Sequence, residues 1–412
     1  MTQSAGSLDA AWEALRRGKA PERGELLRNL TTGMDSMMDF LEGIYFRSYI
    51  PAGGSKIKFV TGNPGSGKTH FAGILQDRAE SAGLMTAAFS AKEIWLHDFR
   101  EVYLEILRQC DIQRVLQGCA RQMIREMGYN PEEISPGKNF LDMLAERGEG
   151  DALSKNEIRA ILRRYFTRNP LLDNTFALCC SLLTGDMLGY PVLENTSREL
   201  ILAYLNGSKA VKLAQLRAIG LAPSAITRHN ARHMLRSLCE IIRLSGKSGL
   251  LVVIDDLEVL LNRAAAEPVH YTRLRREDAY ENIRQLIDDI DSMRYVLFCL
   301  CFDRELEDNE SLGIKSYQAL WLRIQNEVVS RRFNRFADMI DMDRYGDEMY
   351  TPEVLREMSR KLAEEASRAG ISPVQAMTDS QVKELLERAE YGRLGLPYLV
   401  NRMTLEGGAE HE

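Results

Sequence analysis

Long apolar runs are missing from this chain of 412 residues, and their absence excludes a membrane-spanning helix. The longest such stretches, for example Tyr295 to Phe302, are far shorter than the roughly 20 residues that a helix needs to cross a bilayer. The first residues, Met1 to Ala11, lack the basic flank and apolar core of a secretory signal. We therefore expect a cytoplasmic protein with no membrane partner.

Cysteine pairs and an excess of basic residues are missing as well. The seven cysteines form no Cys-x-x-Cys pair, so neither a disulfide framework nor a zinc site is indicated. The net charge of −6 argues against a wholly basic surface for nucleic acid, although a basic face can be local. Hydrophobic residues make up 45% of the chain and charged residues 27%, which is ordinary for a folded globular protein.

A glycine-rich loop is the strongest motif that is present. It fits the phosphate-loop pattern in full, after a strand pattern and before a helix pattern, and consists of Gly62, Asn63, Pro64, Gly65, Ser66, Gly67, Lys68 and Thr69. Its glycines let consecutive backbone N–H groups point at a phosphate, and the following helix adds its positive dipole end. Lys68 is expected to reach the β and γ phosphates, and the Thr69 hydroxyl to coordinate Mg²⁺. We predict ATP and Mg²⁺ as cofactors and include His70 in the nucleotide-binding set.

Acidic residues follow the predicted strand Gly249 to Asp255. In P-loop enzymes an acid at such a strand end holds a magnesium-bound water, and we assign that role to Asp255. We prefer Asp256 to Glu258 as the base for the attacking water, but many hydrolysing relatives carry the longer Glu directly after the first acid. The Asp-Asp pair also resembles signalling P-loop NTPases with a slow, switch-like cycle. The alternative is that these acids only cap the strand.

Periodicity predicts an α/β core interrupted by a purely helical part. Strand patterns occupy Lys56 to Thr61, Leu84 to Ser90, Gly249 to Asp255, Tyr295 to Phe302 and Ala337 to Met342. The predicted segments are an N-terminal helical lead-in over 1–50, the first part of the ATPase core over 51–111, a helical insertion over 112–248, the second part of the core over 249–345, and a C-terminal helical lid over 346–412.

Two further patterns concern the γ-phosphate and a neighbouring subunit. Cys301 and Asp303 stand at the end of a predicted strand, where a polar sensor of the γ-phosphate usually lies. Ring-forming ATPases often place an arginine that reaches into the neighbour's site before the last strand, where this chain has Arg323, Arg331, Arg332 and Arg335. We predict a homo-oligomer in which one of them has this role. The alternative for each is a solvated or salt-bridged arginine.

One helical segment is locally basic and has aromatic residues among its charges. Its cations are Lys155, Arg159, Arg163, Arg164 and Arg168. Such a helix can lie on a phosphate backbone, so DNA is a possible partner. A solvated helix face is the alternative.

Several stretches outside the two nucleotide motifs resemble the ATP-binding proteins of BREX-type bacteriophage-defence systems, the BrxD-like branch of the AAA+ ATPases. They are ALRRG at 14–18, GGS at 53–55, YLNG at 204–207, LRAIGL at 216–221, RREDAYENIRQLID at 275–288 and SYQALWLR at 316–323. The family usually has Asp-Glu where Asp255 and Asp256 stand, and Pro-Arg where this chain has Pro397 and Tyr398. The second difference implies that the lid arginine of many AAA+ proteins is absent, unless Arg393 or Arg402 replaces it.

The resemblance implies an AAA+-like P-loop NTPase with a parallel central sheet, a large helical insertion and a C-terminal helical lid. It also implies an ATPase of anti-phage defence that assembles with itself, with other defence-system proteins or with DNA. One alternative is a STAND-like interaction switch with slow hydrolysis, which Asp256 favours. Another is a transposition or helicase-loader ATPase, for which a recognisable DNA-binding unit at one end is expected.

Overall fold

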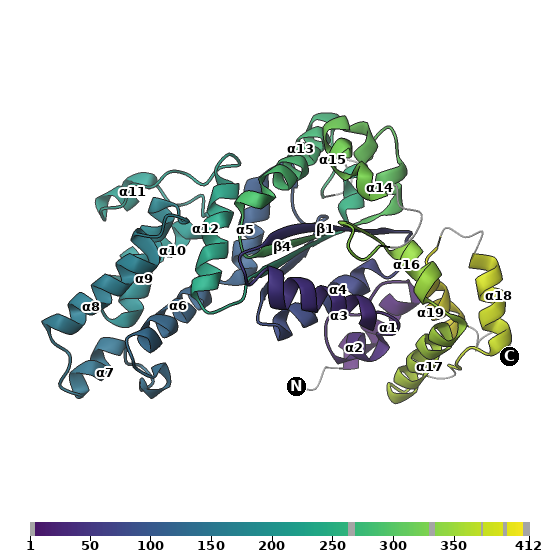
Figure 1. The fold of residues 1–412 in the computed structure, drawn as a ribbon, viewed down its shortest axis with the longest axis horizontal. Coiled ribbons are helices and arrows are strands. Elements are labelled where there is room, and N and C mark those ends of the chain that lie inside the picture. The colour runs from purple at the N-terminus through teal and green to yellow at the C-terminus, as the bar shows by residue number, and fades with distance from the viewer. Residues whose placement is uncertain (1–4, 263–267, 329–333, 372–373, 390–393, 407–412) are drawn as a thin grey trace.

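A five-stranded parallel sheet forms the centre of the molecule (Figure 1). The computed structural model describes residues 5–262, 268–328, 334–371, 374–389 and 394–406. In spatial order the strands are β2 (Met85–Ser90), β3 (Leu250–Asp255), β4 (Val296–Asp303), β1 (Ser55–Gly62) and β5 (Met339–Asp341). Every neighbouring pair is parallel, so all strands end at the same edge of the sheet. This order is typical of P-loop NTPases and confirms the predicted fold class.

The strands are buried on both faces of the sheet. In β3, residues Leu250, Val252 and Ile254 join one apolar core, while Leu251 and Val253 join the other. A strand covered on both sides reads as a continuous apolar run, and for this reason the predicted strands lie within two residues of the observed ones.

Helices cover the two faces unequally. On one face lie α2 (Glu25–Leu30), α3 (Asp35–Leu41), the π-helix η1 (Glu42–Tyr49) and α4 (Lys68–Ser81). The first helix, α1 (Ala5–Arg16), packs against the C-terminal helices instead. The other face is covered by α5 (Phe99–Cys110), α13 (Arg273–Asp289), α14 (Arg304–Asp308) and α15 (Gln318–Val328), with the short turns η4 (Leu257–Leu261), η5 (Ile290–Ser292) and η6 (Ile314–Ser316).

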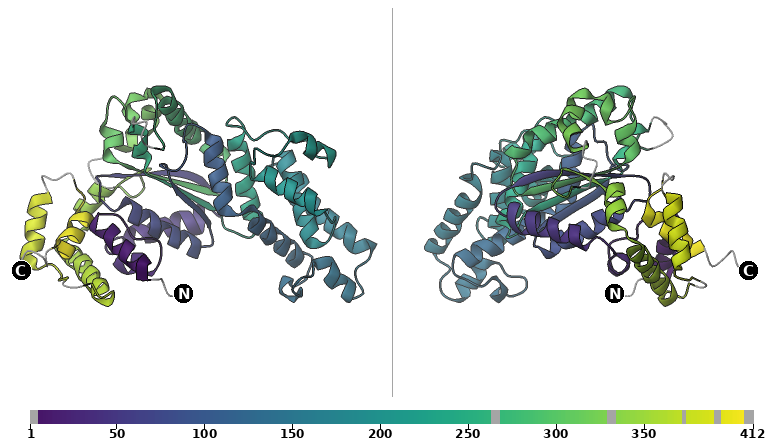
Figure 2. Two further views of the ribbon diagram at one scale, coloured as in Figure 1. Left: turned by 180° about the vertical axis from the view of Figure 1, so that it is seen from behind. Right: turned by 45° about the vertical axis from the view of Figure 1, so that its right-hand side comes forward.

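Along the chain, a long helical arm is inserted between β2 and β3, directly after α5 (Figures 1 and 2). Residues 112–248, all of them described, contain helices and no strand. The elements are α6 (Ile112–Glu126), η2 (Pro131–Glu133), α7 (Phe140–Glu146), α8 (Ala152–Leu162), η3 (Arg163–Thr167), α9 (Asn174–Leu188), α10 (Asn195–Leu205), α11 (Leu213–Ala218) and α12 (Ala231–Leu244). The arm shares one continuous apolar core with the sheet.

The C-terminal helices lie at the opposite end of the sheet from the arm (Figures 1 and 2). They are α16 (Met342–Met349), α17 (Pro352–Arg368), α18 (Asp379–Ala389) and α19 (Leu396–Glu406). Trp12 and Leu15 of α1 pack with Leu362, Ala366 and Leu405 of these helices, so the two ends of the chain form one cluster. Within the described ranges, none of the helices has both the length and the apolar character that crossing a membrane requires.

Candidate functional site

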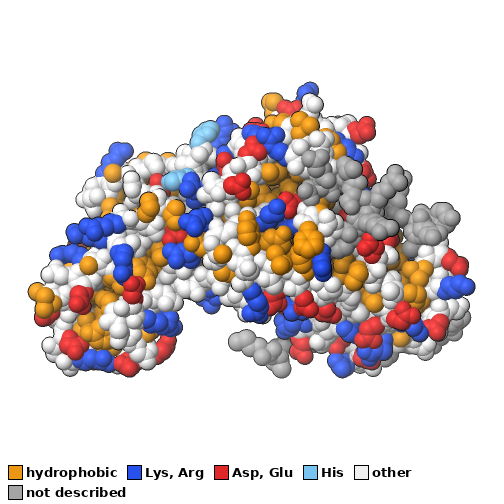
Figure 3. Space-filling model, viewed as in Figure 1, with side chains coloured by type: hydrophobic (Ala, Val, Ile, Leu, Met, Phe, Trp, Pro, Cys, Tyr) orange, Lys and Arg blue, Asp and Glu red, His pale blue; other side chains and the backbone are white. Residues whose placement is uncertain are grey.

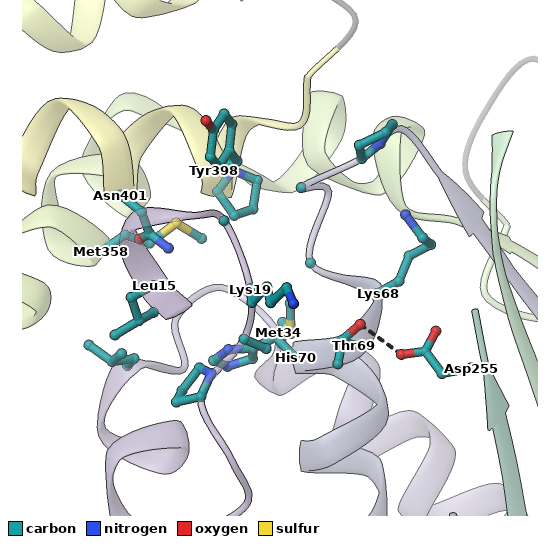
Figure 4. Close-up of a pocket in the computed structure, with 18 of the residues that line it drawn as sticks. Leu15, Lys19, Met34, Lys68, Thr69, His70, Asp255, Met358, Tyr398 and Asn401 are labelled. Atoms are coloured by element: carbon teal, nitrogen blue, oxygen red, sulfur yellow. Dashed lines mark hydrogen bonds between the residues drawn. The ribbon is translucent and has the colours of Figure 1, made fainter. Parts of the chain in front are cut away.

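A cavity of about 520 Å³ opens at the edge where the parallel strands end, and Figure 4 shows it in close-up. Open parallel sheets commonly bind ligands at this edge. One end of the cavity is formed by the glycine-rich loop and by acids from β3 and β4. The other end comes from the N-terminal segment and the C-terminal helices, and includes Leu15, Met358 and Asn401.

The glycine-rich loop is wound into the start of α4. Gly65 and Gly67 have φ values of 79° and 95°, a left-handed conformation that glycine adopts without strain. The backbone N–H of Asn63 donates to both carboxylate oxygens of Asp343, at 3.1 and 2.9 Å. Gly67, Lys68 and Thr69 line the cavity, so the N-terminal end of α4 faces it with its positive dipole end.

Lys68 is buried below the loop. Its Nζ donates to the carbonyl oxygens of Gly62 and Asn63, each at 3.0 Å, and lies 2.7 Å from Oδ1 of Asp303. Asp303 ends β4 directly beside Gly62. Of the two proposed sensor positions, Asp303 lines the cavity, whereas Cys301 is buried with its sulfur 3.8 Å from that of Cys299.

Thr69 and Asp255 both line the cavity and are hydrogen-bonded to each other (Figure 4). The Thr69 hydroxyl donates to Oδ2 of Asp255 at 2.7 Å. Burial raises the pKa of Asp255, although the hydrogen bond from Thr69 opposes the shift. A hydroxyl and a buried carboxylate that both face one cavity are a donor set that fits a hard cation such as Mg²⁺.

Asp256 is held by Ser90, the last residue of β2, and by Lys92 just after it. Its Oδ2 accepts from the Ser90 hydroxyl at 2.5 Å, and its Oδ1 lies 2.6 Å from Nζ of Lys92. Burial alone would raise the pKa of Asp256, but these hydrogen bonds outweigh it and hold the pKa below its ordinary value. Asp256 has a left-handed backbone, with φ 62° and ψ 34°, and such outliers gather at functional sites.

Glu258 lies beside the same lysine. Its Oε1 is 3.2 Å from Nζ of Lys92, and its Oε2 accepts from the backbone N–H of Asp303 at 3.3 Å. Burial and the nearby Asp303 carboxylate raise the pKa of Glu258. Both proposed bases thus line the cavity and share one cation, so the structure keeps both alternatives open.

A second ionic cluster holds the loop from the side of β5. Arg304, directly after β4, donates through Nε to Asp343 at 2.9 Å and through Nη2 to Asp341 at 2.6 Å. Because Asp343 also binds the N–H of Asn63, this cluster ties the ends of β4 and β5 to the loop. Its residues lie about 240 to 280 positions from the loop and stand in no recognisable motif, so the cluster could not be predicted from the sequence.

His70 faces the N-terminal segment. Its Nε2 lies 2.8 Å from the Thr31 hydroxyl, which itself donates to the carbonyl of Leu27. The hydroxyl has one proton, so Nε2 is the donor in this contact. His70 keeps some exposed surface, but its ring lies deep enough for burial to lower the pKa to about 4.

The start of α19 packs directly onto the glycine-rich loop. The N–H groups of Gly395 and Tyr398 donate to the carbonyls of Pro64 and Gly65, at 3.0 and 3.2 Å. A Cβ on Gly65 would lie 2.4 Å from that of Tyr398, so only glycine fits there. Tyr398, which stands where the resembled family has arginine, therefore covers the loop. Arg393 lies outside the described residues, and the described Arg402 does not line the cavity.

The arginines proposed to act on a neighbour lie away from the cavity. Arg323 forms an ion pair with Asp288 of α13, at 2.6 and 2.9 Å. Arg335 lies over the rings of Phe40 and Phe336, at 5.1 and 5.5 Å from their centroids. Arg331 and Arg332 fall outside the described residues. A role of any of them in a second subunit stays a prediction.

The predicted basic helix spans α8 and η3, and part of its charge is engaged within the arm. Lys155 and Arg159 lie over the ring of Tyr190, at 5.7 and 5.0 Å, and Arg164 pairs with Glu126. The two remaining cations, Arg163 and Arg168, are exposed and form no ion pair with a described residue.

Similarity to known proteins was found at the level of the family. Residues 7–401 match the family model described as BREX system ATP-binding protein BrxC/D. No curated protein and no solved structure matches the chain.

Proposed function

The chain belongs to the BREX system ATP-binding protein BrxC/D family, and from this premise we propose that it hydrolyses Mg·ATP in bacterial phage defence. We further propose that its nucleotide state controls assembly with further copies or with other proteins of the system. The observation that carries this proposal is the convergence of Lys68, Thr69 and Asp255 on one cavity.

Phosphate binding is assigned to the loop, the start of α4 and Lys68. In the structure Nζ of Lys68 is neutralised by Asp303, so an incoming phosphate exchanges one anionic partner of this lysine for another. The N–H groups at the start of α4 add donors that need no side chain. Thr69 and Asp255 would hold Mg²⁺, which would supply positive charge to offset that of the phosphates.

The nucleoside is assigned to the other end of the cavity. Leu15 and Met358 give this end apolar surface, and Asn401 adds an amide that can both donate and accept hydrogen bonds (Figure 4). Because the N-terminal and C-terminal helices build this end together, a bound nucleotide bridges both to the sheet. Nucleotide binding can thereby change how these helices are held.

Hydrolysis is assigned to Asp256, with Glu258 as the alternative base. The Lys92 ion pair opposes general-base action, because a carboxylate with a lowered pKa attracts the proton of water less strongly. We therefore expect a low basal turnover that rises when a partner draws Lys92 away from Asp256.

A nucleotide-dependent interaction switch is the second candidate, and the same Lys92 contact favours it. Steady-state ATP turnover, measured alone, with DNA and with the other proteins of the system, separates the two. Stimulated turnover supports the ATPase. Tight ATP binding with near-zero turnover under every condition supports the switch, and no binding of ATP at all would overturn both.

A further inference from the structure

One stretch of the arm contains no acidic residue. Residues 200–239 hold six Lys and Arg and two His but no Asp or Glu. At the average content of the chain, 40 residues would hold about six acids, so the gap is a local feature of this stretch. The whole arm, residues 112–248, has 19 Lys and Arg against 13 Asp and Glu, a net charge of +6, and the rest of the chain has −12.

The acid-free stretch is held in a defined shape. Arg100 of α5 donates to the carbonyl of Gly207 at 2.7 Å and to that of Ile226 at 2.9 Å. The guanidinium group of Arg100 therefore joins the two ends of the loop 207–226. Leu216 and Leu221 are buried, which fixes α11 against the rest of the arm. Lys209 and Arg228 each stand two residues along the chain from one of these two carbonyls.

Its cations are exposed and lack acidic partners. Lys209, Lys212, Arg217 and Arg228 are all exposed, and none forms an ion pair with a described residue. The acids that approach the stretch contact other residues, both in α12: Asp289 pairs with Arg232, and Oδ2 of Asp173 lies 3.9 Å from Nε2 of His233. Figure 3 shows Lys, Arg and His side chains along the edge of the arm that α10–α12 form, whereas Asp and Glu are mixed with Lys and Arg near α7 and α8.

The chemistry of this surface fits a phosphate backbone better than a protein. Protein interfaces are centred on buried apolar anchors, but no large hydrophobic side chain of residues 200–239 is more than partly exposed. Single-stranded nucleic acid binds by stacking on aromatic rings, and the one Phe, Tyr or Trp here, Tyr204, is buried. Double-stranded RNA-binding domains contact two successive minor grooves over roughly 16 base pairs, whereas the four cations here come from one closed loop and the residues directly after it.

We infer that the surface formed by Lys209, Lys212, Arg217 and Arg228 binds double-stranded DNA through its phosphates, without sequence preference. The inference deepens the proposed function, since it gives the arm a partner, but DNA binding is measured without hydrolysis and can fail independently of it. It also moves the DNA contact from the predicted basic helix of α8 and η3 to the acid-free surface.

The test measures binding of a labelled duplex DNA to the full chain over a series of salt concentrations. One variant changes the four cations together: Lys209→Gln, Lys212→Gln, Arg217→Gln and Arg228→Gln. Each lost phosphate contact lowers the slope of log K against log salt by roughly 0.9, so a loss of up to about 3.6 is expected, with affinity down at least about tenfold. ATP affinity serves as the check that the variant is folded and should not change.

Two matched variants keep the inference falsifiable. A body control removes the same charge away from the arm, with Arg47→Gln, Arg356→Gln, Arg360→Gln and Arg368→Gln, and should bind DNA as the wild type does. A helix variant changes Lys155, Arg159, Arg163, Arg164 and Arg168 to Gln and should lose less affinity than the surface variant. The inference is overturned if the helix variant alone loses binding, if the body control loses as much, if duplex RNA binds more tightly, or if the wild type binds no duplex.

Discussion

The nucleotide cavity and the acid-free surface of the arm both hold clustered cations, but only the cavity pairs them with carboxylates. Lys68 has Asp303, and Lys92 has Asp256 and Glu258. The arm surface has no acid of its own over 40 residues. A ligand that enters the cavity must replace a carboxylate that is already paired with a lysine. This requirement favours a ligand of fixed shape that brings its own Mg²⁺. On the arm any polyanion finds free cations, so binding there depends on salt.

Lys68→Ala should separate the two regions most strongly. It removes the charge that meets the terminal phosphates, and we expect ATP affinity to fall by about a hundredfold or more, the scale of losing a buried charge-assisted contact. DNA affinity of the same variant should be unchanged. Calorimetry with ATP and anisotropy with duplex DNA give both numbers, and unchanged ATP affinity would refute the site assignment.

Asp255→Asn should weaken only the Mg²⁺-dependent part of ATP binding. A neutral amide is a poorer ligand for a hard cation, so the gain in ATP affinity on adding Mg²⁺ should shrink by about 10- to 100-fold. Affinity for ATP without Mg²⁺ should change little. If wild type binds ATP equally with and without Mg²⁺, the role given to Thr69 and Asp255 is wrong.

Lys92→Met removes the cation that Asp256 and Glu258 share. The cavity, like the arm surface, would then hold charges without partners. Without the ammonium group the pKa of Asp256 rises, so the acid limb of the pH–turnover profile should move to higher pH. Basal turnover near neutral pH should increase by up to about tenfold, within the range of general-base effects. A profile with its acid limb unmoved would show that Lys92 does not control the base.

The smallest expected effect concerns stability and His70. Its folded-state pKa of about 4 lies below the unfolded value of 6.5. The stabilising contribution is therefore complete above pH 6.5 and is lost as the pH falls from 6.5 toward 4, because the unfolded chain takes up the proton first. His70→Gln, which can still donate to Thr31, should show a smaller drop in unfolding free energy between pH 7 and pH 5. An equal drop in both proteins would exclude His70 as a cause.

Features of the fold and the site that depend only on residues near each other in the sequence could be predicted. The strands could be placed because burial on both faces demands apolar runs, and the glycine-rich loop because its backbone needs glycine at Gly65 and Gly67. The acid at the end of β3 could be predicted because it ends the apolar run of that strand. These features need no knowledge of which segments meet in space.

Long-range contacts could not be predicted in this way. Lys92 and Ser90 reach Asp256 from about 165 residues away, and Asp343 reaches Asn63 from 280. None of them stands in a motif, and each is an ordinary polar residue until the sheet brings the strand ends together. Arg323 shows the reverse case, because a plausible position in the sequence meets Asp288 on a neighbouring helix instead of the cavity.

The most direct test of the central claim is single-turnover ATP hydrolysis by wild type and by variants at the two proposed bases. Asp256→Asn should lower the rate by about 10²-fold or more, and Asp256→Glu should raise it, because Glu restores the reach of the usual base and keeps its charge. Both should bind ATP normally, since Lys68 and Asp255 are untouched. Glu258→Gln is the matched control and should hydrolyse ATP. An inactive Glu258→Gln beside a normal Asp256→Asn would place the base two residues further on and contradict the assignment to Asp256.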